Sequence, residues 1–208
     1  MNLSVTWAEA WIRQCVDVIA DHRVELITLD RDIGDGDHGE NMDRGMKAVV
    51  GKLADGAEDV QGVLKVVAST LMSVVGGAAG PLYGTAFLRA AKATEGDVDA
   101  NGAVAIIAGA LEGIVARGKA TTGEKTMVDS WTPALDAAKA VAESGGTPAA
   151  AFRAAAEAAA KGSDDTIPLR ASKGRASYLG ERSMGHRDPG SLSTAIILKA
   201  AADAAEAA

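Results

Sequence analysis

Hydrophobic residues recur at helical spacing along most of the chain. A first helix is predicted after the candidate N-cap Thr6 by the apolar positions Trp7, Trp11, Cys15, Val18 and Ile19. The same periodicity predicts further helices over residues 40–54, 60–75, 81–92, 103–115, 125–143, 149–160 and 191–208. The pattern therefore indicates a helical protein whose helices are joined by glycine-rich loops.

Three segments refine this prediction. Thr147 and Pro148 are typical of an N-cap followed by proline at the first helical position. Pro133 is expected to kink the helix over 125–143 or to mark its start. Residues 24–29, VELITL, have the composition of a short strand but no evident partner strand. No fixed-period repeat or linker divides the chain, so we expect one all-α domain over residues 1–208.

Composition supports the helical prediction. The chain has 208 residues, which is enough to bury a core, and its charged fraction of 24% excludes disorder as a general description. Alanine dominates the apolar residues and aromatic residues make up only 3%. Because alanine favours helices whereas aromatic and β-branched residues favour sheets, an all-β fold is disfavoured.

Charge and cysteine content restrict the partners. The net charge of −7 argues against nucleic acid as the main ligand, because a surface that binds nucleic acid needs a positive electrostatic field. The single Cys15 excludes an internal disulfide and a multi-thiolate metal site, and packing is its expected role. No apolar run approaches the roughly 20 residues that span a bilayer, and the N-terminus lacks a signal-peptide pattern. We therefore expect a cytoplasmic protein without membrane contact.

The strongest chemical signal is the segment LDRDIGDGDHGEN, residues 29–41, with four aspartates within eight positions. Carboxylates so close together repel one another, so a folded loop needs a counter-charge. Mg²⁺ suits carboxylates together with substrate phosphates. The alternative is a solvated acidic turn whose aspartates cap the following helix. The neighbouring His38, Asn41 and glycines favour the metal site.

Known loop motifs do not explain this segment. Residues 34–39, GDGDHG, match the dinucleotide fingerprint literally, but two aspartates would lie where the pyrophosphate binds and no βαβ pattern follows. No register that starts at an aspartate gives both the glycine and the final glutamate of a calcium-binding loop. A Walker A loop is absent from the sequence.

Three further clusters lie between predicted helices. Residues 76–85, GGAAGPLYGT, suit close approach of backbone N–H groups to an anion, although a tight helix corner also needs small residues. Residues 117–129 mix cations and hydroxyls around glycines, which is also typical of an exposed turn. Residues 170–190 gather five cations in an otherwise acidic chain, and loops of this length are functional or disordered. Together, an acidic loop, two glycine loops and a basic loop indicate a phosphoryl-transfer site.

Four ordered motifs carry a family resemblance: LDRDIGDGDHGENMDRG (29–45), GGAAGPLYGT (76–85), GKATTGEKTM (118–127) and KGRASYLGERSMGHRDPG (173–190). Nearly end to end, the chain resembles the ADP-binding L subunits of dihydroxyacetone kinases. The resemblance implies an all-α fold, an eight-helix antiparallel up-and-down barrel with the nucleotide site in loops at one end.

The resemblance also implies the site residues. Asp30, Asp35 and Asp37 would hold two Mg²⁺ ions, with Asp32 outside the ligand set. Arg175 would stabilise the transferring phosphoryl group. The implied contacts to ADP or ATP are His38, Gly39, Glu40, Asn41, Ala78, Ala79, Gly118, Met127, Arg175, Asp188, Pro189 and Gly190. At one of them the chain departs from the family, because Ala79 stands where a serine is usual and its hydroxyl contact to phosphate is lost.

The activity implied by the resemblance is that of a transferase subunit. Bound ADP would accept a phosphoryl group from the phosphohistidine carrier (M) subunit of the phosphoenolpyruvate phosphotransferase system. The group would then pass to dihydroxyacetone held on a separate K subunit. One alternative is an ATP-dependent kinase subunit that acts on dihydroxyacetone or another short ketose or tetrose. An alternative of another class is a regulatory module that binds a transcription regulator.

Overall fold

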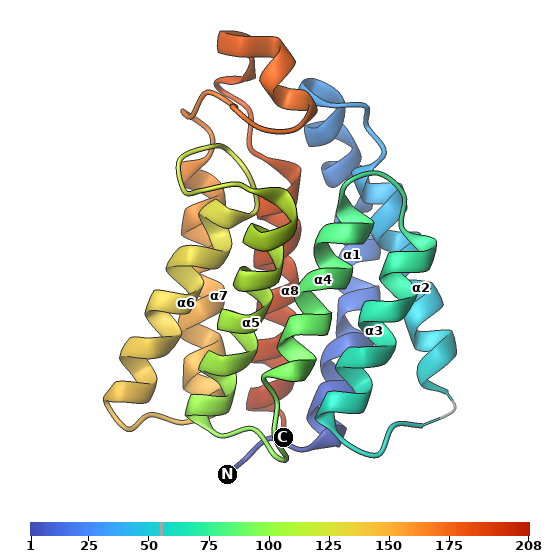
Figure 1. Ribbon diagram of the computed structural model, residues 1–208, viewed down its shortest axis with the longest axis vertical. Coiled ribbons are helices and arrows are strands. Elements are labelled where there is room, and N and C mark those ends of the chain that lie inside the picture. Colours follow the sequence, from blue (N-terminus) through green and yellow to red (C-terminus); the bar gives the residue numbers. More distant parts are fainter. Residues whose placement is uncertain (55) are drawn as a thin grey trace.

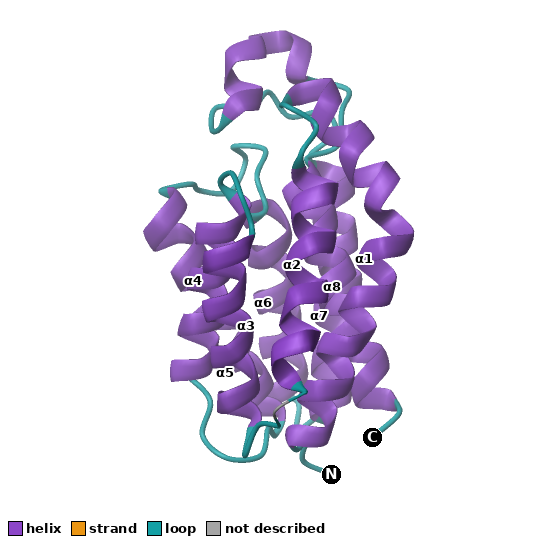
Figure 2. Cartoon of the chain, turned by 90° about the vertical axis from the view of Figure 1, so that its right-hand side faces the viewer, coloured by secondary structure: helices purple, strands orange, loops and turns teal. Residues whose placement is uncertain are grey.

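The computed structural model describes residues 1–54 and 56–208, and in this part of the chain all regular structure is helical (Figures 1 and 2). Among these described residues, the only pairing of strand type is an isolated bridge between Leu3 and Val98. The helices are α1 (Val5–Ile33), α2 (His38–Leu53), α3 (Val60–Val74), α4 (Ala79–Lys92), α5 (Ala100–Gly118), α6 (Val128–Glu143), α7 (Pro148–Asp165), the 3₁₀-helix η1 (Arg175–Ser183) and α8 (Pro189–Glu206). The all-α prediction is thus confirmed.

The possible strand at residues 24–29 is wrong, because this segment lies inside α1. Ile19, Leu26 and Ile33 are spaced by seven residues, which is two helical turns, and all three are buried. This continuous buried face outweighs the β-propensity of the short apolar run. The helix also begins earlier than predicted, with Ser4 rather than Thr6 at the N-cap position.

Pro148 begins a helix as predicted, whereas Pro133 lies within one. Thr147 caps α7 as predicted, since its side chain accepts a hydrogen bond from the backbone N–H of Ala150. Pro133, however, lies inside α6 and does not mark its start. Residues 125–127, which were expected to be helical, belong instead to the turn before α6.

Consecutive helices pack side by side along the chain, and α8 returns to pack against α1. The chain runs up and down between the two ends of the molecule (Figure 1). As a result, the connections α1–α2, α3–α4, α5–α6 and α7–α8 all lie at the same end, at the top of Figure 1. These are the four connections that carry the chemical clusters of the sequence.

The core combines a small aromatic cluster with alanine-rich packing. Trp7 stacks on Trp11 with ring centroids 5.3 Å apart, and Phe152 lies 5.0 Å from Trp7. Both indole N–H groups donate to backbone carbonyls of α8, which ties α1 to the most deeply buried helix. Cys15 is fully buried in this core, as its predicted packing role requires.

The helix α5 is long and apolar enough, by length and composition alone, to cross a membrane. In the structure it packs against α4, α6 and α7, with Ile106, Ile107 and Ile114 buried. Apolarity of this degree is also typical of a core helix. The expected cytoplasmic location and absence of membrane contact stay predictions.

Glycines set the close approach of α4 and α5. A Cβ on Gly113 would lie 2.6 Å from the carbonyl oxygen of Thr85, whereas a Cβ on Gly51 of α2 would meet no atom within 4 Å. We therefore expect Gly113→Ala to lower the free energy of unfolding by about 1–3 kcal/mol. The matched Gly51→Ala should raise it by about 0.5–1 kcal/mol through helix propensity. Denaturant unfolding followed by circular dichroism measures both, and equal stability of the two variants would contradict this packing.

Candidate functional site

A cleft of about 300 Å³ opens at the end of the molecule where the four connections meet. Segments far apart in the sequence line it, including the α1–α2 corner, the start of α4, the turn before α6, the start of η1 and the start of α8. The sequence-predicted site residues that line it are Asp30, Asp35, Asp37, His38, Ala78, Ala79, Gly118, Met127, Arg175, Asp188, Pro189 and Gly190.

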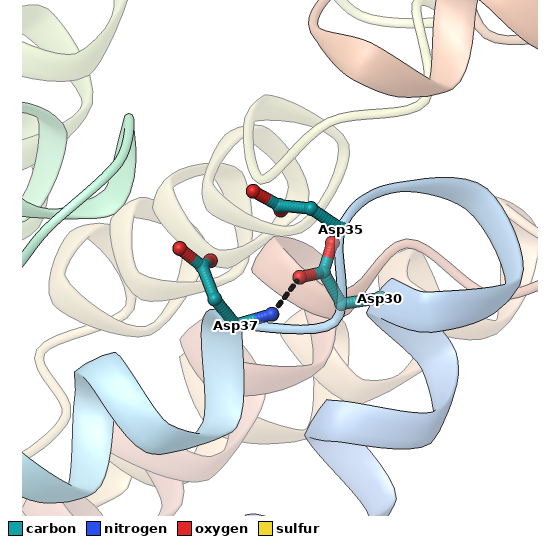
Figure 3. A group of neighbouring side chains, drawn as sticks. All are labelled: Asp30, Asp35 and Asp37. Atoms are coloured by element: carbon teal, nitrogen blue, oxygen red, sulfur yellow. Dashed lines mark hydrogen bonds between the residues drawn. The ribbon is translucent and has the colours of Figure 1, made fainter.

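Three carboxylates converge at the corner between α1 and α2 (Figure 3). Asp30 lies in the last turn of α1, Asp35 in the connecting loop and Asp37 at the N-cap position of α2. One oxygen from each lies within 4.8 Å of the others, a grouping that suits a metal ion. Asp32 is not part of this group, and its carboxylate instead lies 3.5 Å from Nδ1 of His186.

Backbone N–H groups hold one carboxylate of the cluster in place. Asp30 Oδ2 accepts hydrogen bonds from the backbone N–H groups of Asp37, at 2.8 Å, and His38, at 3.1 Å. Burial raises the pKa of Asp30, the His38 N–H lowers it, and the negative charges of Asp35 and Asp37 raise it further. The cluster is therefore an acidic centre whose anionic form needs positive charge nearby.

In the part of the chain that the structure describes, one cation forms an ion pair with this cluster. Arg175, the first residue of η1, places Nη2 at 2.9 Å from Oδ2 of Asp35. One guanidinium facing three carboxylates leaves an excess of negative charge. Oxygen donors at this spacing are the ligands that Mg²⁺ prefers, so the residues fit a divalent cation.

The corner between α3 and α4 presents backbone to the cleft. Gly77 adopts a φ of 64°, and a Cβ there would lie 3.7 Å from a carboxylate oxygen of Asp37. Helix α4 begins beside it, with Ala78 and Ala79 on the cleft wall. Free N–H groups at such a helix start favour an anion. Because Ala79 has no hydroxyl, these contacts can come only from the backbone.

The turn at the start of α8 forms another part of the cleft wall. The Asp188 carboxylate caps this helix by accepting from the N–H of Ser191 at 2.6 Å. Burial raises the pKa of Asp188 to about 7, against the lowering effect of that N–H group. A Cβ on Gly190 would come within 3.4 Å of Met127, so glycine lets these two segments meet.

Three predicted nucleotide contacts do not line the cleft. Gly39 lies at a helix crossing, since a Cβ there would be 2.3 Å from the carbonyl oxygen of Arg23 on α1. Glu40 forms an ion pair with Arg23. Asn41 is buried, and its side-chain oxygen accepts from Arg44 at 2.5 Å. Their assignment as nucleotide contacts stays a prediction.

Some residues that line the cleft were not predicted as site residues from the sequence. Lys125 lines the cleft although it is 1% exposed, and Lys173 lies at the rim beside η1. Apolar side chains of Leu82, Ile114 and Val128 complete the lining. Helical periodicity marks such residues as core, so no local pattern distinguishes a cleft wall from ordinary packing.

The sequence of the chain is similar to a known domain family and to several named proteins. The family model described as DAK2 domain matches residues 32–203. The ADP-binding subunit DhaL of the PEP-dependent dihydroxyacetone kinase of Escherichia coli (strain K12) is 42% identical over 99% of this chain and 100% of its own length. The L-erythrulose 1-kinase of Mycolicibacterium smegmatis is 36% identical over 88% of this chain, but this covers only 33% of that protein.

A solved structure shares the fold. The dihydroxyacetone kinase from C. freundii, in complex with AMP-PNP and Mg²⁺, superimposes with a TM-score of 0.72 at 22% identity. The superposition covers 94% of this chain and 33% of that one. Together with the family model and the relative of equal length, this likeness shows that the chain belongs to the DAK2 domain family.

Proposed function

We propose that this protein is the ADP-binding subunit of a PEP-dependent dihydroxyacetone kinase, and therefore a transferase. The observation that carries the proposal is the convergence of Asp30, Asp35 and Asp37 in a cleft that Arg175 also lines. Relatives of 41–42% identity, matched over 96–100% of their length, are named as ADP-binding subunits of PEP-dependent or PTS-dependent dihydroxyacetone kinases. The pairing of consecutive helices and the contact between α8 and α1 support the proposal of an eight-helix antiparallel barrel.

The acidic cluster is proposed to hold two Mg²⁺ ions. Its donor set consists only of oxygen atoms, and its uncompensated charge fits a divalent cation bound together with phosphates. When bound, Mg²⁺ would neutralise charge on the phosphates of ADP or ATP. Asp30 is already oriented by two backbone N–H groups, so its contribution needs little rearrangement.

The remaining cleft residues are proposed to bind the nucleotide. The start of α4, at Ala78 and Ala79, offers backbone N–H groups for phosphate oxygens. Gly118, Met127 and the turn at residues 188–190 also line the cleft, where small or apolar groups can contact a base and a ribose.

The proposed reaction takes place in two transfers. A nucleotide held in the cleft would accept the phosphoryl group of a phosphohistidine carrier (M) subunit, whose P–N bond breaks and leaves the free histidine. The group would then pass to a hydroxyl of dihydroxyacetone held on a K subunit, which leaves ADP in the cleft and gives the hydroxyl proton to solvent. Arg175 lines the cleft beside Asp35, and we propose that its guanidinium neutralises negative charge on the group in transit. The protein's part is positioning and charge neutralisation.

A second candidate is an ATP-dependent kinase subunit for dihydroxyacetone or another short ketose or tetrose. Ala79 favours it, because the missing hydroxyl removes one contact that would retain ADP between turnovers. Relatives named as erythrulose kinases, at 34–36% identity, show that family members bear such names. The higher identity to the ADP-binding subunits favours the first candidate.

We expect Asp37→Asn to abolish Mg²⁺-dependent ADP binding, with a loss of affinity of at least about 100-fold, because it removes one of three converging carboxylates. Helicity should be unchanged, since the N-cap side chain of α2 makes no capping bond. Isothermal titration calorimetry with ADP and Mg²⁺ measures the affinity. The matched control Asp32→Asn changes the same acidic segment outside the cluster and should bind like the parent protein. Unchanged affinity in Asp37→Asn would contradict the metal role.

Arg175→Ala should lower the rate of phosphoryl transfer by about 100-fold or more, and it should weaken ADP binding by less than about tenfold. The reason is that the positive charge of Arg175 is proposed to stabilise the phosphoryl group during its transfer more than it stabilises bound ADP. The assay combines this chain with a K subunit, a phosphohistidine carrier and dihydroxyacetone. Arg182→Ala, on the same 3₁₀-helix but exposed, is the control and should transfer at the parental rate. Equal losses in binding and transfer would make Arg175 a simple binding group.

A further inference from the structure

A buried lysine connects three segments around the cleft. Lys125 is only 1% exposed and lies in the turn before α6. Its Nζ donates to the carbonyl oxygen of Thr166 at 2.6 Å, to that of His186, and at the longer distance of 3.4 Å to that of Ile167. An ammonium group has three N–H donors, so three backbone carbonyls match it completely.

The backbone conformation of Lys125 is also strained. Its backbone φ is 62°, in the left-handed region that favours glycine. Among the described residues, Lys119 is the only other non-glycine residue with positive φ, and its side chain is exposed. Strain of this kind persists where the surrounding contacts compensate for it. At Lys125 those contacts are the three buried carbonyls.

The carbonyls belong to two segments that meet beside the cleft. Thr166 and Ile167 follow the C-terminal end of α7, where unpaired carbonyls and the helix dipole favour a cation. His186 lies two residues before Asp188, which begins the turn at the start of α8. The ammonium thus joins the end of α7 to the chain that forms one wall of the cleft.

Two further hydrogen bonds run between the same segments. The backbone N–H of Gly185 donates to the carbonyl of Ile167 at 2.8 Å, and that of Asp188 donates to Oγ1 of Thr166 at 3.0 Å. Lys125 adds a charged contact at the centre of this junction. The carboxylates of Asp188 and Asp129 stabilise its positive charge by raising its pKa, although burial lowers the pKa overall.

We propose that Lys125 is a positioning residue for nucleotide binding, because its ammonium fixes the turn at residues 188–190 against the end of α7. It acts through these backbone groups and makes no phosphate contact of its own, since its donors are already used by carbonyls. The inference deepens the proposed function, and its ligand is ADP with Mg²⁺.

The test replaces Lys125 by methionine, which keeps the aliphatic volume and removes the ammonium. Lys119→Met is the matched control, because it removes a lysine with positive φ from the same connection but with an exposed side chain. Calorimetry with ADP and Mg²⁺ gives the affinity, and amide hydrogen exchange reports local order. We expect Lys125→Met to bind ADP at least tenfold more weakly and to exchange at least tenfold faster at residues 184–190, with α3 unchanged. Lys119→Met should match the parent protein.

The outcomes separate this inference from the proposed function. If the parent protein does not bind ADP, the proposed function fails, while the exchange at residues 184–190 still tests the junction. ADP affinity within twofold of the parent in Lys125→Met would overturn the positioning role. Equally faster exchange in every helix would also overturn it, because the lysine would then support only general stability.

A second variant applies if Lys125→Met does not fold. Thr166→Val removes the hydroxyl that accepts from Asp188 and leaves the lysine in place. It loosens the same turn by one neutral hydrogen bond, so we expect a threefold to tenfold loss of ADP affinity and faster exchange confined to residues 184–190. Parental affinity together with faster exchange there would show that the position of this turn does not control binding, and would overturn the proposal.

Discussion

Mutual repulsion among three carboxylates at the α1–α2 corner is the constraint on which the arrangement of the cleft depends. Asp30, Asp35 and Asp37 lie within reach of a single cation, although burial and like charge both raise the pKa of Asp30. Backbone N–H groups at the start of α2 and the guanidinium of Arg175 offset part of this cost. The residual negative charge is what makes a divalent cation with a phosphorylated ligand a suitable occupant.

The helical frame explains how segments so distant in sequence reach that charge. Because the helices run up and down, every second connection returns to the same end (Figure 1). Close crossings at glycines and the indole bonds from Trp7 and Trp11 to α8 hold the frame. The connections are therefore free to carry polar and charged residues, which are costly in the core. Lys125 is a buried cation that links two of these connections.

Local patterns were sufficient to predict the helices and the acidic cluster. Periodicity located the helices, and the cluster could be predicted because its members lie within eight positions of one another. The strand at residues 24–29 failed because the burial of Leu26 depends on packing across the molecule. The 3₁₀-helix η1 is strongly polar, with Ser183 as its buried residue, and was expected only as a loop. The carbonyls that Lys125 contacts lie 41 and 61 residues away in the chain, a pairing that no local pattern encodes.

The nucleotide content of the purified protein tests the central claim most directly. One sample is dialysed extensively in the presence of Mg²⁺ and another against EDTA, and both are then denatured and the supernatants separated by chromatography. Retention of near-stoichiometric ADP in the first sample and its loss in the second is the predicted result, because the acidic cluster holds the nucleotide through metal. Equal ADP in both samples would contradict the metal-mediated site. Absence of nucleotide from both, followed by no binding of added ADP or ATP with Mg²⁺, would contradict nucleotide binding itself.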